Sequence, residues 1–288
     1  MAFNKRLINT GGGAAASCTT DSADIFSGGV ALYNLDYDAS DASGSYNGSA
    51  SNVTFGVGGK INTGARFNGS SSYIALSGNP INGLSNISLS FWIKPEDVSS
   101  DQYIITFVNS DGGWNGFGVR ISSSAKINIV RANSGAVTSS ESSTASISTG
   151  VLKHIAITSS QSEAKIYIDG SLDSTHSISG FTTNNTGEYN LGALKNSGSY
   201  SQFYDGDLDQ VRVFSKVLNS TEVGTLYAET ACVYTSTTDN NNYPVTNAAY
   251  YKLDNSSEDF STGGNDGTDT NIEYRFGRFG QAAVFNGS

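Results

Sequence analysis

Residues 154–172 read HIAITSSQSEAKIYIDGSL, and this stretch contains two strand patterns joined by a polar turn. In the second pattern, Lys165–Asp169, Ile166 and Ile168 alternate with more polar neighbours. A period of two residues places alternate side chains on opposite faces of a strand. Asp169-Gly170 ends the pattern, and an Asp-Gly pair is a strong signal for a two-residue hairpin turn. The stretch therefore predicts an antiparallel sheet that buries one face.

The same alternation occurs elsewhere in the chain. Residues Ile87–Ile93 alternate apolar side chains with serines and a tryptophan, and Pro95 ends the pattern because proline cannot donate a ladder hydrogen bond. Lys153–Thr158 and Leu208–Phe214 give two further strands. Many Gly, Ser, Thr and Asn residues lie between such segments, as expected for tight turns. We predict an all-β protein.

One short helix is predicted after the last of these strands, in LNSTEVGTLYAE at residues 218–229. Asn219 can cap the first turn, and Glu222 completes a capping box three residues later. Leu218 and Val223 are spaced as a hydrophobic staple. Apolar residues recur at helical spacing, so this helix is expected to pack on the sheets.

Composition argues against several classes of partner. The formal net charge is −10 and charged residues make up 15% of the chain. An acidic surface repels phosphate backbones, so we expect no nucleic acid ligand. No apolar run approaches the ~18 residues of a membrane span. Residues 1–17 lack the apolar segment of a signal peptide, so we expect synthesis in a cytoplasm, where Cys18 and Cys232 would be free thiols.

The chain begins to repeat itself near its end. Phe67 and Phe285 both precede Asn-Gly-Ser and are 218 positions apart, as are Asp36 and Asp254. A repeat of this length is a whole domain rather than a solenoid unit. We therefore expect a fragment of a longer tandem-domain protein, in which 218 residues separate equivalent positions. Its expected parts are an attachment segment at 1–27, a domain at 28–229, a linker at 230–247 and an incomplete second copy at 248–288.

Four segments in this order resemble a laminin-G-like domain of the concanavalin A type. They are RFNGSSSYI (66–74), SLSFWIKP (88–95), HIAITSSQSEAKIYIDGSL (154–172) and YDGDLDQVRVFSKVLNSTEVGTLY (204–227). The resemblance spans about residues 28–228. It implies a two-sheet antiparallel jelly-roll sandwich. Such domains are usually calcium-assisted carbohydrate- or protein-binding modules and only sometimes parts of glycosidases.

The N-terminal FNKRLINTGGG and the Ser/Thr/Asn-rich tandem layout also resemble virion surface proteins of marine tailed phages. This resemblance implies a fibre, spike or decoration protein on the virion surface, with an extracellular location as the alternative. We expect a homo-oligomer that contacts other virion subunits through residues 1–27 and 232–288 and binds host surface glycans. A purely structural subunit-contact protein is the alternative function.

The sequence favours a protein that is not an enzyme. It contains no G-x-S-x-G elbow, H-E-x-x-H pair or P-loop, so nucleophilic, zinc and phosphoryl-transfer chemistry lack their motifs. A glycosidase needs only two facing carboxylates. A polysaccharide hydrolase therefore stays open as a third alternative, on fold analogy alone.

A structural calcium site is predicted where the first and last strands adjoin. Asp209 lies in phase with the valines of its strand, so its carboxylate is expected to point inward, where an unpaired charge is costly. A calcium ion bound also by Asp41 and Asn47 would offset that cost. Alternatively, Asp41 is an Asx-turn residue and Asp209 pairs with Arg212 or backbone amides.

A glycan site is predicted from aromatic residues in two polar, Gly-rich loops. Sugar binding needs an exposed aromatic ring with convergent amides and carboxylates. Trp114 lies in DGGWNGFG, and Tyr200 and Tyr204 lie in SGSYSQFYDGD. The polar residues expected to bond sugar hydroxyls are Asp111, Asn115 and Asp205. The alternative is that these rings only close the ends of the sandwich.

Overall fold

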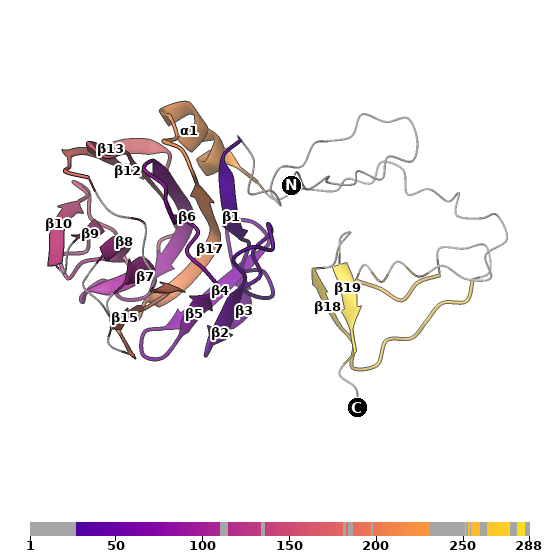
Figure 1. Ribbon diagram of the computed structural model, residues 1–288. Coiled ribbons are helices and arrows are strands. Elements are labelled where there is room, and N and C mark those ends of the chain that lie inside the picture. The colour runs from indigo at the N-terminus through magenta and orange to yellow at the C-terminus, as the bar shows by residue number, and fades with distance from the viewer. Residues whose placement is uncertain are drawn as a thin grey trace. The chain divides into compact units, whose positions relative to one another are not determined.

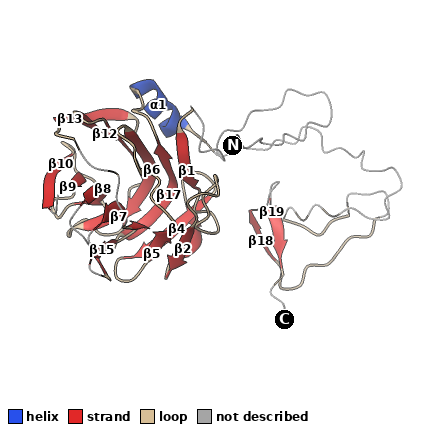
Figure 2. Cartoon of the chain, viewed as in Figure 1, coloured by secondary structure: helices blue, strands red, loops and turns tan. Residues whose placement is uncertain are grey.

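The chain forms two compact units, Met1–Ala231 and Cys232–Ser288. The boundary falls within the predicted linker at 230–247. The described residues contain many strands and a single helix (Figure 2). The computed structural model describes residues 27–109, 115–133, 136–180, 183, 187–196, 198–230, 251, 253, 255–259, 264–276 and 281–285.

Two antiparallel sheets build the first unit (Figure 1). One has eight strands in the order β13-β12-β11-β6-β17-β4-β3, and β1 also pairs with β17. We call it the eight-stranded sheet. Its strands are β1 (Gly29–Tyr33), β3 (Thr54–Gly58), β4 (Thr63–Asn68), β6 (Ile87–Pro95), β11 (Lys153–Ser159), β12 (Glu163–Ile168), β13 (Ser171–Ser177) and β17 (Asp205–Phe214).

The other sheet has seven strands in the order β10-β9-β8-β7-β14-β5-β2, and we call it the seven-stranded sheet. Its strands are β2 (Gly48–Ser51), β5 (Tyr73–Leu76), β7 (Gln102–Asn109), β8 (Asn115–Ile121), β9 (Ile127–Asn133), β10 (Ala136–Ser142) and β14 (Glu188–Leu191). A separate two-stranded hairpin is formed by β15 (Leu194–Asn196) and β16 (Ser199–Ser201).

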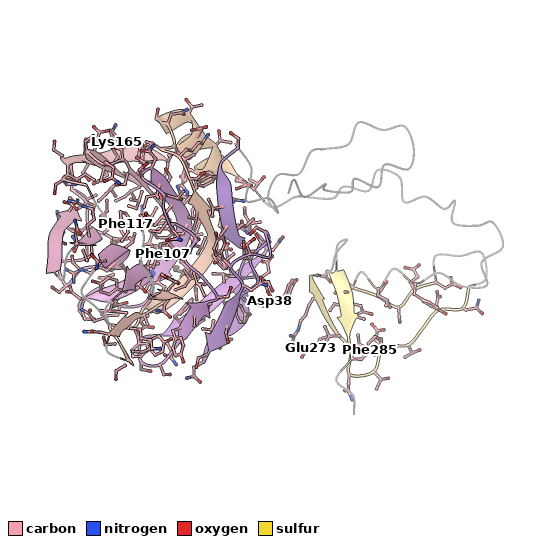
Figure 3. All side chains as sticks on the ribbon, in the orientation of Figure 1. Asp38, Phe107, Phe117, Lys165, Glu273 and Phe285 are labelled. Carbon is pink, nitrogen blue, oxygen red and sulfur yellow. The ribbon has the colours of Figure 1, made fainter. Side chains whose placement is uncertain are left out.

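The core lies between the inner faces of the two sheets. Leu89 and Phe91 enter it from β6, and Phe107 and Phe117 enter it from β7 and β8. Phe107 lies opposite Phe117 in the strand register, and Figure 3 shows both inside the unit while Lys165 lies at its surface. Burying an apolar side chain of this size stabilises the fold by about 1.5–3 kcal/mol. The predicted all-β, two-sheet jelly-roll sandwich is confirmed.

The predicted hairpin in residues 154–172 is also present. β11 pairs with β12, and β12 pairs with β13. Asp169 and Gly170 join β12 to β13 with φ values of 50° and 77°. Positive φ at both central positions is typical of the hairpin turn that Asp-Gly favours. The sequence therefore determines this part of the sheet locally.

A β-bulge in β17 reverses the predicted orientation of Asp209. In the pairing of β17 with β6, Asp209 lies opposite Trp92 and Arg212 lies opposite Ser90, so two residues of β17 face one residue of β6. Gln210 lies in this bulge with a φ of 51°. The extra residue shifts the alternation. Asp209 therefore shares the outer face with Trp92, and the prediction that it points inward is wrong.

The predicted helix is α1 (Ser220–Ala228), and it packs on the outer face of the eight-stranded sheet. Asn219 caps it, and Glu222 closes the capping box. Val223 and Leu226 of the helix pack against Phe214 in a small apolar cluster. With nine residues, this helix of the described chain falls short of the length and apolar character that a membrane span requires.

The second unit repeats a bridge found at the start of the first. Tyr251 and Asp259 pair as an isolated antiparallel bridge, as Tyr33 and Asp41 do. Next to these bridges, Leu35 in the first unit and Leu253 in the second both have positive φ, at 59° and 56°. These are non-glycine residues in the left-handed region, which is uncommon. The same local strain thus occurs at both sites.

The side-chain contacts of the two loops also agree. The N–H of Asp41 donates to Oδ1 of Asn47 at 3.0 Å, and the N–H of Asp259 donates to Oδ1 of Asp266 at 3.0 Å. The second unit adds a hairpin of β18 (Glu273–Phe276) and β19 (Gln281–Val284), at the place in sequence that β3 and β4 occupy in the first. These agreements support the proposal that the second unit is built like the opening of the first.

We predict that Asn219→Ala destabilises the first unit by about 1 kcal/mol, because it leaves N–H groups of the first helical turn without their cap. For a unit of this size the melting temperature should fall by roughly 2–4 °C. Asn219→Gly should lower the stability by only about a few tenths of a kcal/mol. Thermal melting monitored by circular dichroism measures both variants. Equal losses for alanine and glycine would contradict the capping role.

Candidate functional site

The predicted glycan residues that the structure describes, Asn115, Tyr200, Tyr204 and Asp205, have different environments. Asp111 and Trp114 lie outside the described residues. Asn115 begins β8, where it pairs with Asn109 of β7. The remaining three residues lie near one another in sequence, but the structure gives them different environments.

Tyr204 belongs to the core and not to a binding surface. Its side chain is fully buried, its ring lies 6.0 Å from that of Phe67, and its hydroxyl donates to the backbone oxygen of Asp207 at 3.0 Å. Burial raises the pKa of this hydroxyl well above its ordinary value. A ring without exposed surface cannot stack on a sugar, so the prediction for Tyr204 is wrong.

Asp205 lies at the start of β17 beside other acids. Its backbone N–H donates to Oε1 of Gln102 at 2.9 Å, and its backbone oxygen accepts from the N–H of Glu96 at 2.9 Å. Burial, followed by the charges of Asp97 and Glu96, raises the pKa of its carboxyl. These contacts link Asp205 to the segment between β6 and β7.

Tyr200 lies on the outer face of the seven-stranded sheet and stacks on a second tyrosine. Its ring lies 3.7 Å from that of Tyr73, with an angle of 18° between the planes. The ammonium of Lys195 lies 5.1 Å from the centre of the Tyr200 ring. The Tyr200 hydroxyl donates to Oδ1 of Asn190 at 3.3 Å. We call Tyr73, Asn190, Lys195 and Tyr200 the tyrosine platform.

Strand alternation explains why Tyr73 faces outward. In β5, Ile74 and Leu76 point into the core, so Tyr73 lies on the opposite face. In β14, Tyr189 and Leu191 point inward in the same way, which places Asn190 on the outer face. The sequence motifs did not single out Tyr73, although its alternation with Ile74 was a usable signal.

The β15–β16 hairpin places Lys195 and Tyr200 over this face. Leu194 of β15 packs with Tyr103 and Val130, and the Thr106 hydroxyl donates to the backbone oxygen of Ala193 at 3.0 Å. These contacts fix the base of the hairpin on β7 and β9. Both tyrosine rings keep part of their surface exposed. The platform is thus a rigid aromatic surface beside a cation.

Asn190 has a spare donor beneath the platform. Its side chain is 1% exposed, and its Nδ2 has no hydrogen-bond partner within the described part of the chain. An amide donor without a partner in such a position is costly.

The predicted metal ligands Asp41 and Asn47 are held by hydrogen bonds with each other and with backbone amides. The Asp41 carboxylate accepts from the N–H groups of Leu32, Ser43, Ser45 and Tyr46 and from the Ser43 hydroxyl. Oδ1 of Asn47 accepts from the N–H of Asp41. Oxygens surrounded by N–H donors do not suit a cation. This geometry fits the Asx-turn interpretation of Asp41.

Asp209 binds a different segment. Its Oδ2 accepts from the N–H groups of Lys60 and Ile61 at 2.7 and 3.0 Å. Its Oδ1 has no hydrogen-bond partner among the described residues. Asp41 and Asp209 thus have separate hydrogen-bond partners, and the donors around Asp41 do not fit a shared ion. Across the described residues, no group of three or more His, Cys, Asp or Glu side chains is arranged to hold a metal. Calcium binding stays a prediction.

Two buried groups on the outer face of the eight-stranded sheet, Asp209 and His154, have shifted pKa values. Burial raises the pKa of Asp209 to about 7, despite the amides of Ile61 and Lys60 that lower it. Burial lowers the pKa of His154 to about 3. The His154 ring accepts or donates a hydrogen bond with the Ser90 hydroxyl at 2.9 Å. Both groups are therefore mostly uncharged at pH 6, which lowers the cost of burying them.

The fold defines the class of protein as a two-sheet jelly roll of the concanavalin A type. The model of the concanavalin A-like lectin/glucanases superfamily matches residues 68–224. The chain belongs to this superfamily. The predicted laminin-G-like domain is thereby confirmed.

Solved structures support the same fold. Domain 4 of AbnA, an extracellular arabinanase from Geobacillus stearothermophilus in complex with arabinotriose, is 20% identical with a TM-score of 0.57, covering 69% of this chain and 98% of that one. The binding domain of Paraclostridial Mosquitocidal Protein 1 is 18% identical with a TM-score of 0.56, and the match covers 69% of this chain and 52% of that one. The botulinum neurotoxin type G receptor binding domain is 22% identical with a TM-score of 0.52, covering 69% and 50%. The chain thus spans about half the length of the two toxin domains. No curated protein sequence matches it.

We predict that Asp209→Asn reduces the pH dependence of stability. The Asp209 carboxyl has a pKa of about 7 in the folded chain, against an ordinary value of 3.8. A carboxyl with a raised folded pKa stabilises the fold when protonated, so its contribution is full below pH 3.8 and is lost as the pH rises to about 7. The shift corresponds to roughly 4 kcal/mol between these limits.

Melting temperatures of wild type and variant across pH 4 to 8 measure this effect. The variant should gain stability relative to wild type as the pH rises, with the difference levelling above about pH 7. Asp38→Asn, at an exposed position, serves as the control. Parallel curves for wild type and Asp209→Asn would show that Asp209 does not titrate in this range.

Proposed function

We propose that the first unit is a non-catalytic module that binds surface glycans through the tyrosine platform. The observation that carries this proposal is the stacked, partly exposed pair of Tyr73 and Tyr200. Aromatic faces bind the apolar face of a sugar ring. The Lys195 ammonium lies beside the Tyr200 ring and can donate to sugar hydroxyls.

The platform is suited to weak, repeated binding. Stacking of Tyr200 on Tyr73 fixes the ring before a ligand arrives, so little side-chain entropy is lost on binding. A shallow polar surface nevertheless gives affinities on the order of mM. Tandem copies, or many subunits on one particle, would raise the avidity by orders of magnitude. The repeated loop contacts in the second unit are consistent with such an arrangement.

The resemblance to phage proteins supports a location on the virion surface, as a fibre, spike or decoration protein. The segments proposed to contact other virion subunits, residues 1–27 and 232–288, lie largely outside the described residues. The structural neighbour bound to arabinotriose supports a glycan ligand. A subunit-contact role is the second candidate, and the exposed residues of the platform would then meet another protein.

We predict that Tyr200→Ala weakens glycan binding about tenfold, equivalent to ~1.4 kcal/mol. Tyr73→Ala should have a similar effect, because it removes the ring that supports Tyr200. The measurement is binding of immobilised, multivalent protein to a glycan array and to host polysaccharide. Leu172→Ala, at a residue 53% exposed on β13 of the other sheet, is the matched surface control.

Melting curves accompany the array to show that each variant is folded. Loss of binding in both tyrosine variants, with unchanged binding in Leu172→Ala, supports the proposal. Absence of any glycan signal from multivalent wild-type protein would remove it and favour the subunit-contact role.

A further inference from the structure

A cavity separate from the tyrosine platform lies in the loop that follows β1. It has a volume of about 200 Å³. This space corresponds to roughly seven water molecules, which is enough for one small ring. We call it the Tyr37 pocket, and it is lined by Asn34, Leu35, Asp36, Tyr37, Asp38, Ser40 and Ala42.

The loop around the Tyr37 pocket is fixed at its base. The N–H of Ala42 donates to the backbone oxygen of Leu32 at 2.8 Å, which closes the two ends of the loop on each other. Leu35 is anchored in the core with 1% of its surface exposed. The Asp36 carboxylate accepts from the N–H of Thr63 at 2.9 Å. The walls of the pocket are thus set before a ligand binds.

Tyr37 provides an aromatic wall that faces solvent. It is 54% exposed, although the other tyrosine of this segment, Tyr33, is fully buried. An exposed aromatic ring alone needs no explanation. Here the ring borders a cavity whose lining combines apolar residues, Leu35 and Ala42, with polar ones. An apolar surface with a few polar groups is typical of small-molecule binding sites.

The charged residues among the lining are all acidic. Asp36 and Asp38 contribute carboxylates, and no cationic side chain is among the described residues that line the pocket. Figure 3 shows Asp38 at the surface of the first unit. Such a lining attracts donors and positive charge, and it repels anions.

We propose that the Tyr37 pocket binds one sugar residue without negative charge, and that it prefers an amino sugar to a neutral hexose. The sugar ring stacks on Tyr37, its hydroxyls donate to the Asp36 carboxylate, and an ammonium group pairs with Asp38. This site uses none of the residues of the tyrosine platform. Its existence can therefore be tested independently of the platform.

The test is a titration of the full, isotope-labelled chain with three monosaccharide probes, followed by nuclear magnetic resonance. The probes are glucosamine, methyl glucoside and glucuronic acid. We expect dissociation constants on the order of mM for the first two, with glucosamine several-fold tighter, and no binding of glucuronic acid. Shifted signals should include the amides of residues 34–42.

Three variants locate the effect. Tyr37→Ala should weaken glucosamine and methyl glucoside at least tenfold. Asp38→Asn should remove the preference for glucosamine, because the variant keeps an oxygen for the N–H of Ser40 and loses only the charge. The double variant Tyr73→Ala/Tyr200→Ala should leave both affinities unchanged.

Other results would overturn the proposal. Binding of glucuronic acid as tight as that of glucosamine would contradict the charge argument. Unchanged affinities in Tyr37→Ala would place the sugar elsewhere. Should Tyr37→Ala fail to fold, Asp38→Lys serves instead, and retained glucosamine binding in that variant would equally refute the site.

Discussion

Strand β17 is the element on which the rest of the first unit depends. One edge pairs with β6 along most of its length. The other edge is shared, since Asp205–Leu208 pairs with β4 and Val211–Phe214 pairs with β1. The bulge at Gln210 lies between these two segments. The bulge allows this edge of β17 to pair with two strands, β4 and β1. It also keeps the apolar residues before and after Gln210 facing the core.

The bulge also decides what the outer face of the eight-stranded sheet must accommodate. Asp209 and Arg212 point to that face, where each is 2% exposed. Arg212 forms an ion pair with Glu229, the residue that ends α1. A buried ion pair contributes little net stability, and its loss on one side is costly. We therefore interpret this pair as fixing the position of the helix, while apolar packing supplies most of its stability.

Much of the fold could be predicted because its signals are local. The Asp169-Gly170 turn and the capping box at Asn219 depend on neighbours a few residues away. The orientation of Asp209 could not be predicted from the alternation of residues along β17, because the extra residue at Gln210 reverses which face the side chains point to. Tyr204 was predicted to lie in a binding loop because its neighbours in sequence are polar, but it directly precedes β17 and is fully buried.

The two proposed binding surfaces depend on contacts between chain segments, which patterns in the sequence do not predict. Tyr73 and Tyr200 are far apart in the chain, and they stack only because β5 and the β15–β16 hairpin meet on one face. Tyr37 borders a cavity whose shape depends on the closed base of its loop. One surface is a tyrosine pair on a sheet face, and the other is a tyrosine in a loop closed at its base. Under the proposals above, both are weak sites for sugars on a stable scaffold.

The most direct test of this account is a map of the chain's backbone chemical shifts with a bound oligosaccharide, chosen as the strongest ligand from a glycan array. The account predicts that the largest changes fall on Tyr73, Asn190, Lys195 and Tyr200 or on residues 34–42, with the core unchanged. Changes confined to other surfaces would contradict the assignment of binding to these tyrosines.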